Sequence, residues 1–92
     1  MPKTSREIVV SNPLGLHARP AMALVDTANQ FASQITLRKP GDAPVEADGK
    51  SVMQVITLEA TVGTKLVIEA EGEDAAVAVD KIEELFRSGF GE

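Results

Sequence analysis

The apolar residues of this chain repeatedly change their spacing, between the two-residue period of a β-strand and the longer period of an amphipathic helix. Alternating or β-branched runs predict strands at 6–11, 34–38, 44–48 and 64–71, and helical periods predict helices at 18–33, 51–56 and 73–89. The order is βαββαβα. Since this order favours an antiparallel sheet covered on one side, we predict an α+β open-faced β-sandwich: four antiparallel strands with helices on one face.

The same periods predict which side chains form the core. In the first helix, the predicted core residues are Ala21, Leu24, Val25, Ala28 and Phe31, and the polar side carries Asp26, Asn29, Gln30 and Ser33. In the strands, the predicted core residues are Ile35, Leu37, Val45, Ala47, Leu66, Ile68 and Ala70. In the last helix, they are Ala75, Val79, Ile82 and Phe86. The turn-forming stretch "KPGDA" predicts a hairpin with a long loop, and Gly89 is expected to end the last helix.

Length and composition narrow the class of protein. A chain of 92 residues suffices for one core, so we predict a single domain spanning 1–92. With a net charge of -5, three Phe and neither Trp nor Tyr, the chain offers little for nucleic acid to bind. It has no Cys and one His, which argues against a disulfide framework or a metal site, and the absence of a cofactor motif predicts no cofactor. No apolar leader or membrane-spanning segment is evident, so a cytoplasmic protein without membrane insertion is expected.

The single histidine, His17, lies at the expected start of the first helix. A neutral imidazole is a nucleophile near pH 7, and a helix N-terminus favours an anion. We expect Pro20 to fit the first turn and to push Arg19 out of helical geometry toward a cap position, where its guanidinium suits phosphate oxygens. His17 and Arg19 could therefore hold a phosphoryl group. On spacing alone, a loop histidine beside a solvated arginine is the better interpretation.

Two motifs carry a family resemblance. "NPLGLHARPA" resembles the active-site segment of HPr, the histidine-containing phosphocarrier of the bacterial phosphoenolpyruvate:sugar phosphotransferase system, and "DGKSVMQV" resembles its second signature, around a regulatory serine. The resemblance extends over essentially the whole chain and implies the same open-faced fold. It departs from the family at 39–48, where the hairpin is longer. The segments "HARPAM" and "ELFRSGFGE" also resemble the nitrogen-branch paralogue of HPr.

The resemblance implies a carrier, not an enzyme, with no cofactor. His17 would take a phosphoryl group on Nδ1 from enzyme I and pass it to an enzyme IIA domain, while Arg19 attends the phosphate and Ala18 and Pro20 form the helix start beside it. Ser51 would be modified by an HPr kinase/phosphorylase, with a transcriptional regulator as a further partner, and the protein would act as a monomer. A nitrogen-branch carrier or a purely regulatory interaction module remains the alternative.

Ser51 also has a structural interpretation. Ser51 followed by Gln54 fits a capping box, so a serine here requires no regulatory purpose.

An apolar docking surface is expected around the active site, and flexible side chains there would suit a carrier with several partners. Its candidate residues are Leu16, Met22, Val52, Met53 and Ile56. The alternative is that the methionines belong to the core.

Overall fold

Four strands pair into one antiparallel sheet in the computed structural model, which describes residues 2–92. Met1, included in the predicted domain 1–92, lies outside the described residues. The elements are β1 (Lys3–Val9), α1 (Ala18–Ala28), β2 (Gln34–Lys39), β3 (Val45–Asp48), α2 (Val52–Thr57), β4 (Lys65–Glu71), α3 (Ala75–Arg87) and the short 3-10 helix η1 (Gly89–Gly91). The predicted order βαββαβα is confirmed.

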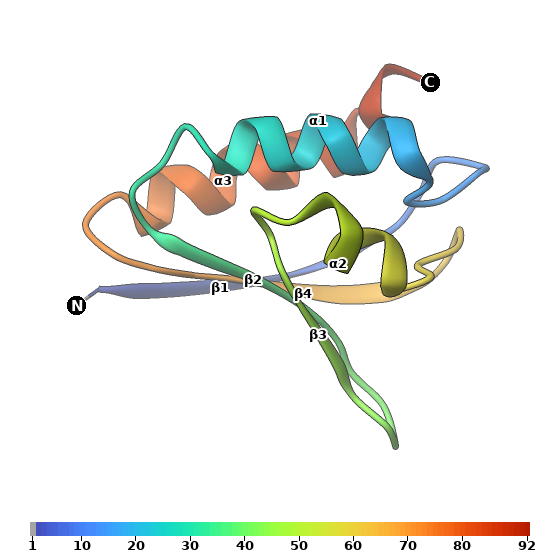
Figure 1. Ribbon diagram of the computed structural model, residues 1–92, viewed down its shortest axis with the longest axis horizontal. Helices are drawn as coiled ribbons and strands as arrows, with labels where there is room; N and C mark the ends of the chain where they lie inside the picture. The colour runs from blue at the N-terminus through green and yellow to red at the C-terminus, as the bar shows by residue number, and fades with distance from the viewer. Residues whose placement is uncertain (1) are drawn as a thin grey trace.

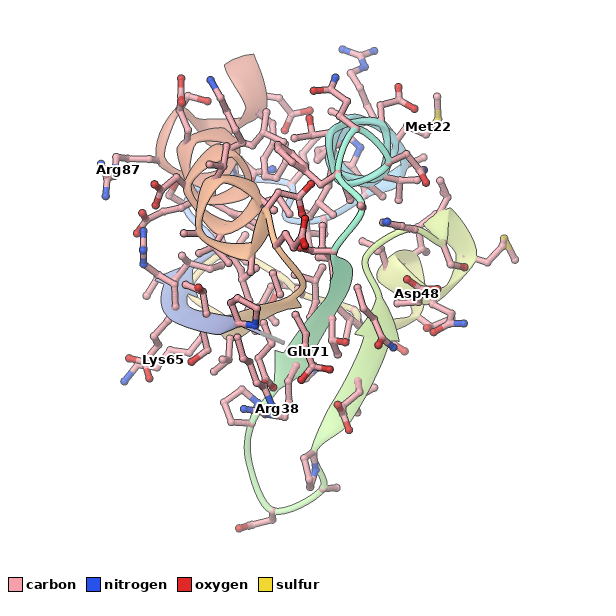
Figure 2. The ribbon with its side chains drawn as sticks, turned by 90° about the vertical axis from the view of Figure 1, so that its left-hand side faces the viewer. Met22, Arg38, Asp48, Lys65, Glu71 and Arg87 are labelled. Atoms are coloured by element: carbon pink, nitrogen blue, oxygen red, sulfur yellow. The ribbon has the colours of Figure 1, made fainter. Side chains whose placement is uncertain are left out.

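The strands lie in the order β1-β4-β2-β3, so that β1 and β3 form the two edges. Helices α1 and α3 lie side by side over one face, α2 packs against α1, and the β2–β3 hairpin projects beyond the helices (Figure 1). Figure 2 shows Arg38 and Glu71 on the side of the sheet away from α1 and α3. The predicted covered face and solvent-facing face are both present.

A single cluster of aliphatic side chains fills the space between helices and sheet. Ile35, Leu37, Leu66 and Ile68 from the strands are fully buried in it, opposite Leu24 of α1 and the buried stripe of α3. The alternating and helical periods therefore predicted most of the core. Among residues 2–92, no helix is both long and apolar enough to cross a bilayer.

Some predicted boundaries were wrong. Strand β1 begins at Lys3 because its polar first residues pair with β4 as far as Glu71, which gives them backbone partners that the apolar pattern could not reveal. Val45, predicted to face the core, is exposed where β3 starts in the projecting hairpin.

Helix α1 also ends earlier than predicted, at Ala28, with Asn29 as its C-cap. Phe31 then packs against the core from the connection, and Ser33, predicted on a polar helix face, is buried. The burial of Ser33 is satisfied by Asp74, whose carboxylate accepts hydrogen bonds from the Ser33 hydroxyl, from the Ser33 amide at 3.0 Å and from the Ala32 amide at 2.9 Å. The start of α3 is thereby tied to the start of β2.

Candidate functional site

His17 is the N-cap residue of α1. Its backbone is extended, at φ -74° and ψ -173°, and its carbonyl accepts the first helical hydrogen bond, from the Ala21 amide at 3.0 Å. The amides of Ala18 and Arg19 precede that bond and so have no acceptor within the helix. The imidazole therefore shares its position with the electropositive end of α1.

Arg19 lies inside α1, which corrects the prediction that Pro20 pushes it out of helical geometry. Pro20 is the third residue of the helix, where an amide would have no helical acceptor, so the missing N–H costs nothing. Pro20 itself is buried, whereas Arg19 is exposed and takes part in no ion pair within residues 2–92.

The loop before His17 packs against the backbone at Ala60, which is distant in the sequence. Gly15 has φ +67°, and a Cβ there would come within 2.4 Å of the Ala60 carbonyl oxygen, so only glycine fits. The Leu16 amide donates to that same carbonyl at 2.9 Å. Leu16 is consequently 5% exposed and part of the core, which corrects its predicted place on a docking surface.

Two residues that the sequence analysis missed contact the site. The Nε2 atom of His17 lies 2.7 Å from Oε2 of Glu92, and the other carboxylate oxygen accepts a 3.0 Å hydrogen bond from Nδ2 of Asn12. Nδ2 of Asn12 also donates to the Gly15 carbonyl at 2.7 Å. No sequence spacing links His17 to a residue 75 positions away.

The surroundings of Glu92 keep it ionised. The hydrogen bond from Asn12 lowers the pKa of the Glu92 carboxyl, the hydrogen bond and charge of His17 and the charge of Arg19 act in the same direction, and partial burial opposes them. The pKa lies below its ordinary value, so Glu92 is a carboxylate at neutral pH and can only accept hydrogen bonds.

A surface pocket adjoins these groups, bounded by Arg19 and Glu92 together with Pro13, Leu14 and Phe90. Phe90 stacks edge-to-face on Phe86 of α3, with ring centroids 4.9 Å apart, and so fixes the segment that carries Glu92. Within residues 2–92, no three His, Cys, Asp or Glu side chains gather as metal ligands. The site thus consists of an imidazole, a guanidinium and free helix amides.

Ser51 is the N-cap of α2, where its hydroxyl accepts a 3.3 Å hydrogen bond from the Gln54 amide. The predicted capping box is only half formed, because Oε1 of Gln54 accepts from the Asp48 amide at 2.9 Å instead of returning to Ser51. The Ser51 amide donates to the Asp48 carbonyl, which closes the turn from β3 into α2.

The remaining docking candidates lie on α1 and α2. Met22 is 54% exposed, Met53 75% and Ile56 37%, whereas Val52 is half-buried against the core. Figure 2 shows Met22 pointing outward from α1. Leu14, which the sequence analysis did not select, is also exposed and lines the pocket beside Arg19. Apolar side chains are therefore exposed on both helices.

Comparisons with known proteins agree on one relationship. The family model described as the PTS HPr component phosphorylation site matches residues 4–88. The phosphocarrier protein NPr of Proteus mirabilis is 45% identical over 87 residues, which cover 95% of this chain and 94% of that protein. The phosphocarrier protein HPr of Xylella fastidiosa is 41% identical over 86 residues, covering 94% and 93%. The crystal structure of HPr-C-His from Thermoanaerobacter tengcongensis matches with a TM-score of 0.88 at 36% identity, covering 97% of both chains.

Proposed function

Because this chain belongs to the HPr family of phosphocarrier proteins, we propose that His17 accepts a phosphoryl group on Nδ1 from phosphoenolpyruvate-charged enzyme I and passes it to an enzyme IIA domain. The observation that carries this proposal is the unequal use of the two ring nitrogens. Nε2 is held 2.7 Å from Glu92, while Nδ1 makes no hydrogen bond within residues 2–92. Nδ1 is therefore the nitrogen available to a phosphorus atom.

Acceptance and donation use the same groups in opposite directions. The lone pair of Nδ1 forms the new N–P bond as the bond to the donor's nitrogen breaks, and the electron pair of that bond stays with the donor. The N-terminal amides of α1, including those of Ala18 and Arg19, and the Arg19 guanidinium then face the phosphoryl oxygens as hydrogen-bond donors. The buried ring of Pro20 keeps this helix start in place. The protein carries the group between partners and transforms no substrate of its own.

The exposed Met22, Met53 and Ile56, with the outer part of Val52, form the docking surface in this proposal. Flexible apolar side chains fit several partner surfaces with modest affinity, which suits a carrier that must release each partner. Leu16 has no part in it, because it is buried.

A second candidate function is that of a carrier in the nitrogen branch of the phosphotransferase system. It is favoured by the 45% identity to the phosphocarrier protein NPr of Proteus mirabilis, against 41% to the HPr of Xylella fastidiosa. The "GKS" that precedes Val52 favours the sugar branch and control by an HPr kinase/phosphorylase at Ser51. A purely regulatory module, acting by binding alone, is the third candidate. In each case we propose a single-domain, monomeric, cytoplasmic protein.

Reconstitution of the full relay tests the proposal. The protein is mixed with phosphoenolpyruvate and either sugar-branch or nitrogen-branch enzyme I, each followed by its own IIA domain, and phosphorylation of the IIA domain is measured. We expect transfer that requires this protein and is abolished by His17→Ala. Faster transfer with one enzyme I assigns the branch. A protein that binds IIA but transfers nothing would be an interaction module instead.

A further inference from the structure

The Glu92 carboxylate that contacts His17 also has a second partner. The side chain of Glu92 is only 18% exposed, and each of its carboxylate oxygens has its own partner, Nε2 of His17 at 2.7 Å and Nδ2 of Asn12 at 3.0 Å. Asn12 is 2% exposed and bonded to the Gly15 carbonyl as well, so it holds the carboxylate from the protein interior. Phe90, stacked on Phe86, fixes the chain two residues before Glu92.

Glu92 is brought to the site by the last turn of the chain, η1, after the segment that the family model matches. The family model matches residues 4–88, whereas η1 and Glu92 follow that segment. In Figure 1 the chain leaves α3 and turns toward the start of α1, where His17 lies. The turn after α3 therefore places the Glu92 carboxylate beside His17.

The chemistry of the contact fixes the location of a proton. A carboxylate can only accept, so the 2.7 Å contact requires Nε2 to donate its hydrogen. In a neutral imidazole only one nitrogen carries hydrogen, and the other then bears the lone pair. With the hydrogen on Nε2, the lone pair is on Nδ1.

We propose that Glu92 is a positioning residue for His17: its carboxylate keeps the ring hydrogen on Nε2, orients the ring, and leaves Nδ1 as the nucleophile. The inference rests on the proposed phosphoryl transfer. When the Nδ1 lone pair forms the bond to phosphorus and the donor's P–N bond breaks toward the donor, the ring becomes positively charged and keeps its Nε2 hydrogen. Glu92 then faces that positive charge, and donation to the next protein reverses the step and returns the ring to neutrality.

The test compares four variants of the whole protein. Glu92→Gln keeps the shape and removes the charge, Glu92→Ala removes both, and Glu92→Asp restores the charge on a shorter side chain. Glu73→Gln is the matched control, since it makes the same charge change on an exposed residue just before α3. Two quantities are measured: the imidazole nitrogen chemical shifts of His17 in unphosphorylated protein, and the rate of phosphoryl acceptance from charged enzyme I.

In the wild type and Glu73→Gln we expect shifts that report hydrogen on Nε2 and a lone pair on Nδ1. In Glu92→Ala and Glu92→Gln we expect the hydrogen to be shared between the nitrogens and acceptance to slow by roughly tenfold or more, as for loss of a charge-assisted hydrogen bond. Glu92→Asp should recover part of the rate. Melting temperatures should stay close to the wild-type value.

Wild-type acceptance rates in Glu92→Gln and Glu92→Ala would overturn the proposal, and so would slower acceptance with unchanged nitrogen shifts. Failure of the proposed function gives a different result, because the wild type itself would then take no phosphoryl group from either enzyme I. In that event the nitrogen shifts still decide whether Glu92 sets the position of the ring hydrogen.

Discussion

Each side of the His17 ring has a different environment. Nε2 faces a carboxylate 2.7 Å away, while Nδ1 is without a hydrogen-bond partner in the described part of the chain and belongs to a residue that caps a helix. In the proposed function, a group bound to Nδ1 is on the ring nitrogen that does not contact Glu92, and the helix amides and Arg19 are its proposed donors. At the scale of single residues, the two ring nitrogens are therefore distinguished by the contact of Nε2 with Glu92.

The rate of phosphoryl transfer should depend on how well the residue at position 19 donates hydrogen bonds to the phosphoryl group. A charge-assisted hydrogen bond of this kind contributes about 1.5 to 3 kcal/mol, so Arg19→Ala should slow transfer to a IIA domain by roughly 10- to 100-fold. Arg19→Lys should recover only part, because an ammonium cannot bind two oxygens in the same plane. Arg87→Ala, which removes the same charge from the exposed end of α3, is the control. Equal transfer rates in all variants would contradict the role.

Asp74 should contribute stability that depends on pH. The Ser33 hydroxyl, followed by the Ala32 and Ser33 amides, lowers the pKa of the Asp74 carboxyl below its ordinary value. A lowered folded-state pKa adds stability that is present above the unfolded value, about 3.9, and is lost as the pH falls through the folded value. Urea unfolding should therefore show Asp74→Asn less stable than wild type at pH 7, with a smaller gap at pH 3. Asp26→Asn, on the exposed side of α1, serves as control. A gap unchanged by pH would refute this assignment.

At the scale of elements, the two short connections into helices explain where the site forms. The loop before α1 is fixed by Gly15 against Ala60, and the turn before α2 is closed by Ser51 and Asp48. Both helices are preceded by a partly exposed N-cap residue, His17 before α1 and Ser51 before α2. A long-range contact before α1 and a local turn before α2 thus account for the positions of the two candidate residues.

Ser51→Asp and Ser51→Ala should separate capping from regulation. The Ala variant loses the bond to the Gln54 amide and should be less stable by about 1 kcal/mol, while Asp keeps the cap. Asp also places a negative charge at the start of α2, close in sequence to Met53, and should slow phosphoryl acceptance from enzyme I relative to Ala. Chemical denaturation and acceptance rates are the two measurements. If the Asp and Ala variants accept the phosphoryl group at the same rate, the regulatory role of Ser51 is contradicted and only its capping role remains.

The elements also show what the sequence could predict. His17 at a helix start, Ser51 as a cap and the buried stripes of α1 and α3 follow from local spacing, and they were predicted correctly. The burial of Leu16, by contrast, depends on a contact with Ala60, and the bond from His17 to Glu92 spans nearly the whole chain. Contacts between segments that are distant in the chain leave no periodic pattern in the sequence, so these two contacts could be identified only from the structure.

At the scale of the molecule, the two faces of the sheet differ. One face lies beneath the helices, which place His17, Met22 and Met53 on their outer side, and the other carries charged side chains such as Arg38 and Glu69. The exposed apolar side chains on α1 and α2 favour these helices over the charged sheet face for docking.

Glutamate at Met22 or Met53 should weaken binding to enzyme I severalfold or more while changing stability by less than about 0.5 kcal/mol, as expected for exposed positions. Val77→Glu is a matched control, because Val77 on α3 is 54% exposed, as is Met22. Binding is measured by titration calorimetry and stability by thermal unfolding. Unchanged affinity in the Met22 and Met53 variants would place docking elsewhere, and a large loss of stability would mean that these methionines support the core.

The location of the phosphorus atom tests the central claim most directly. Protein labelled with ¹⁵N in histidine is incubated with enzyme I and phosphoenolpyruvate, its intact mass is recorded, and the phosphorus–nitrogen coupling is measured by NMR. The account predicts the addition of one acid-labile phosphoryl group, coupled to Nδ1 of His17 and absent from His17→Ala. Phosphorus coupled to Nε2, a phosphoryl group retained by His17→Ala, or no gain in mass at all would contradict it.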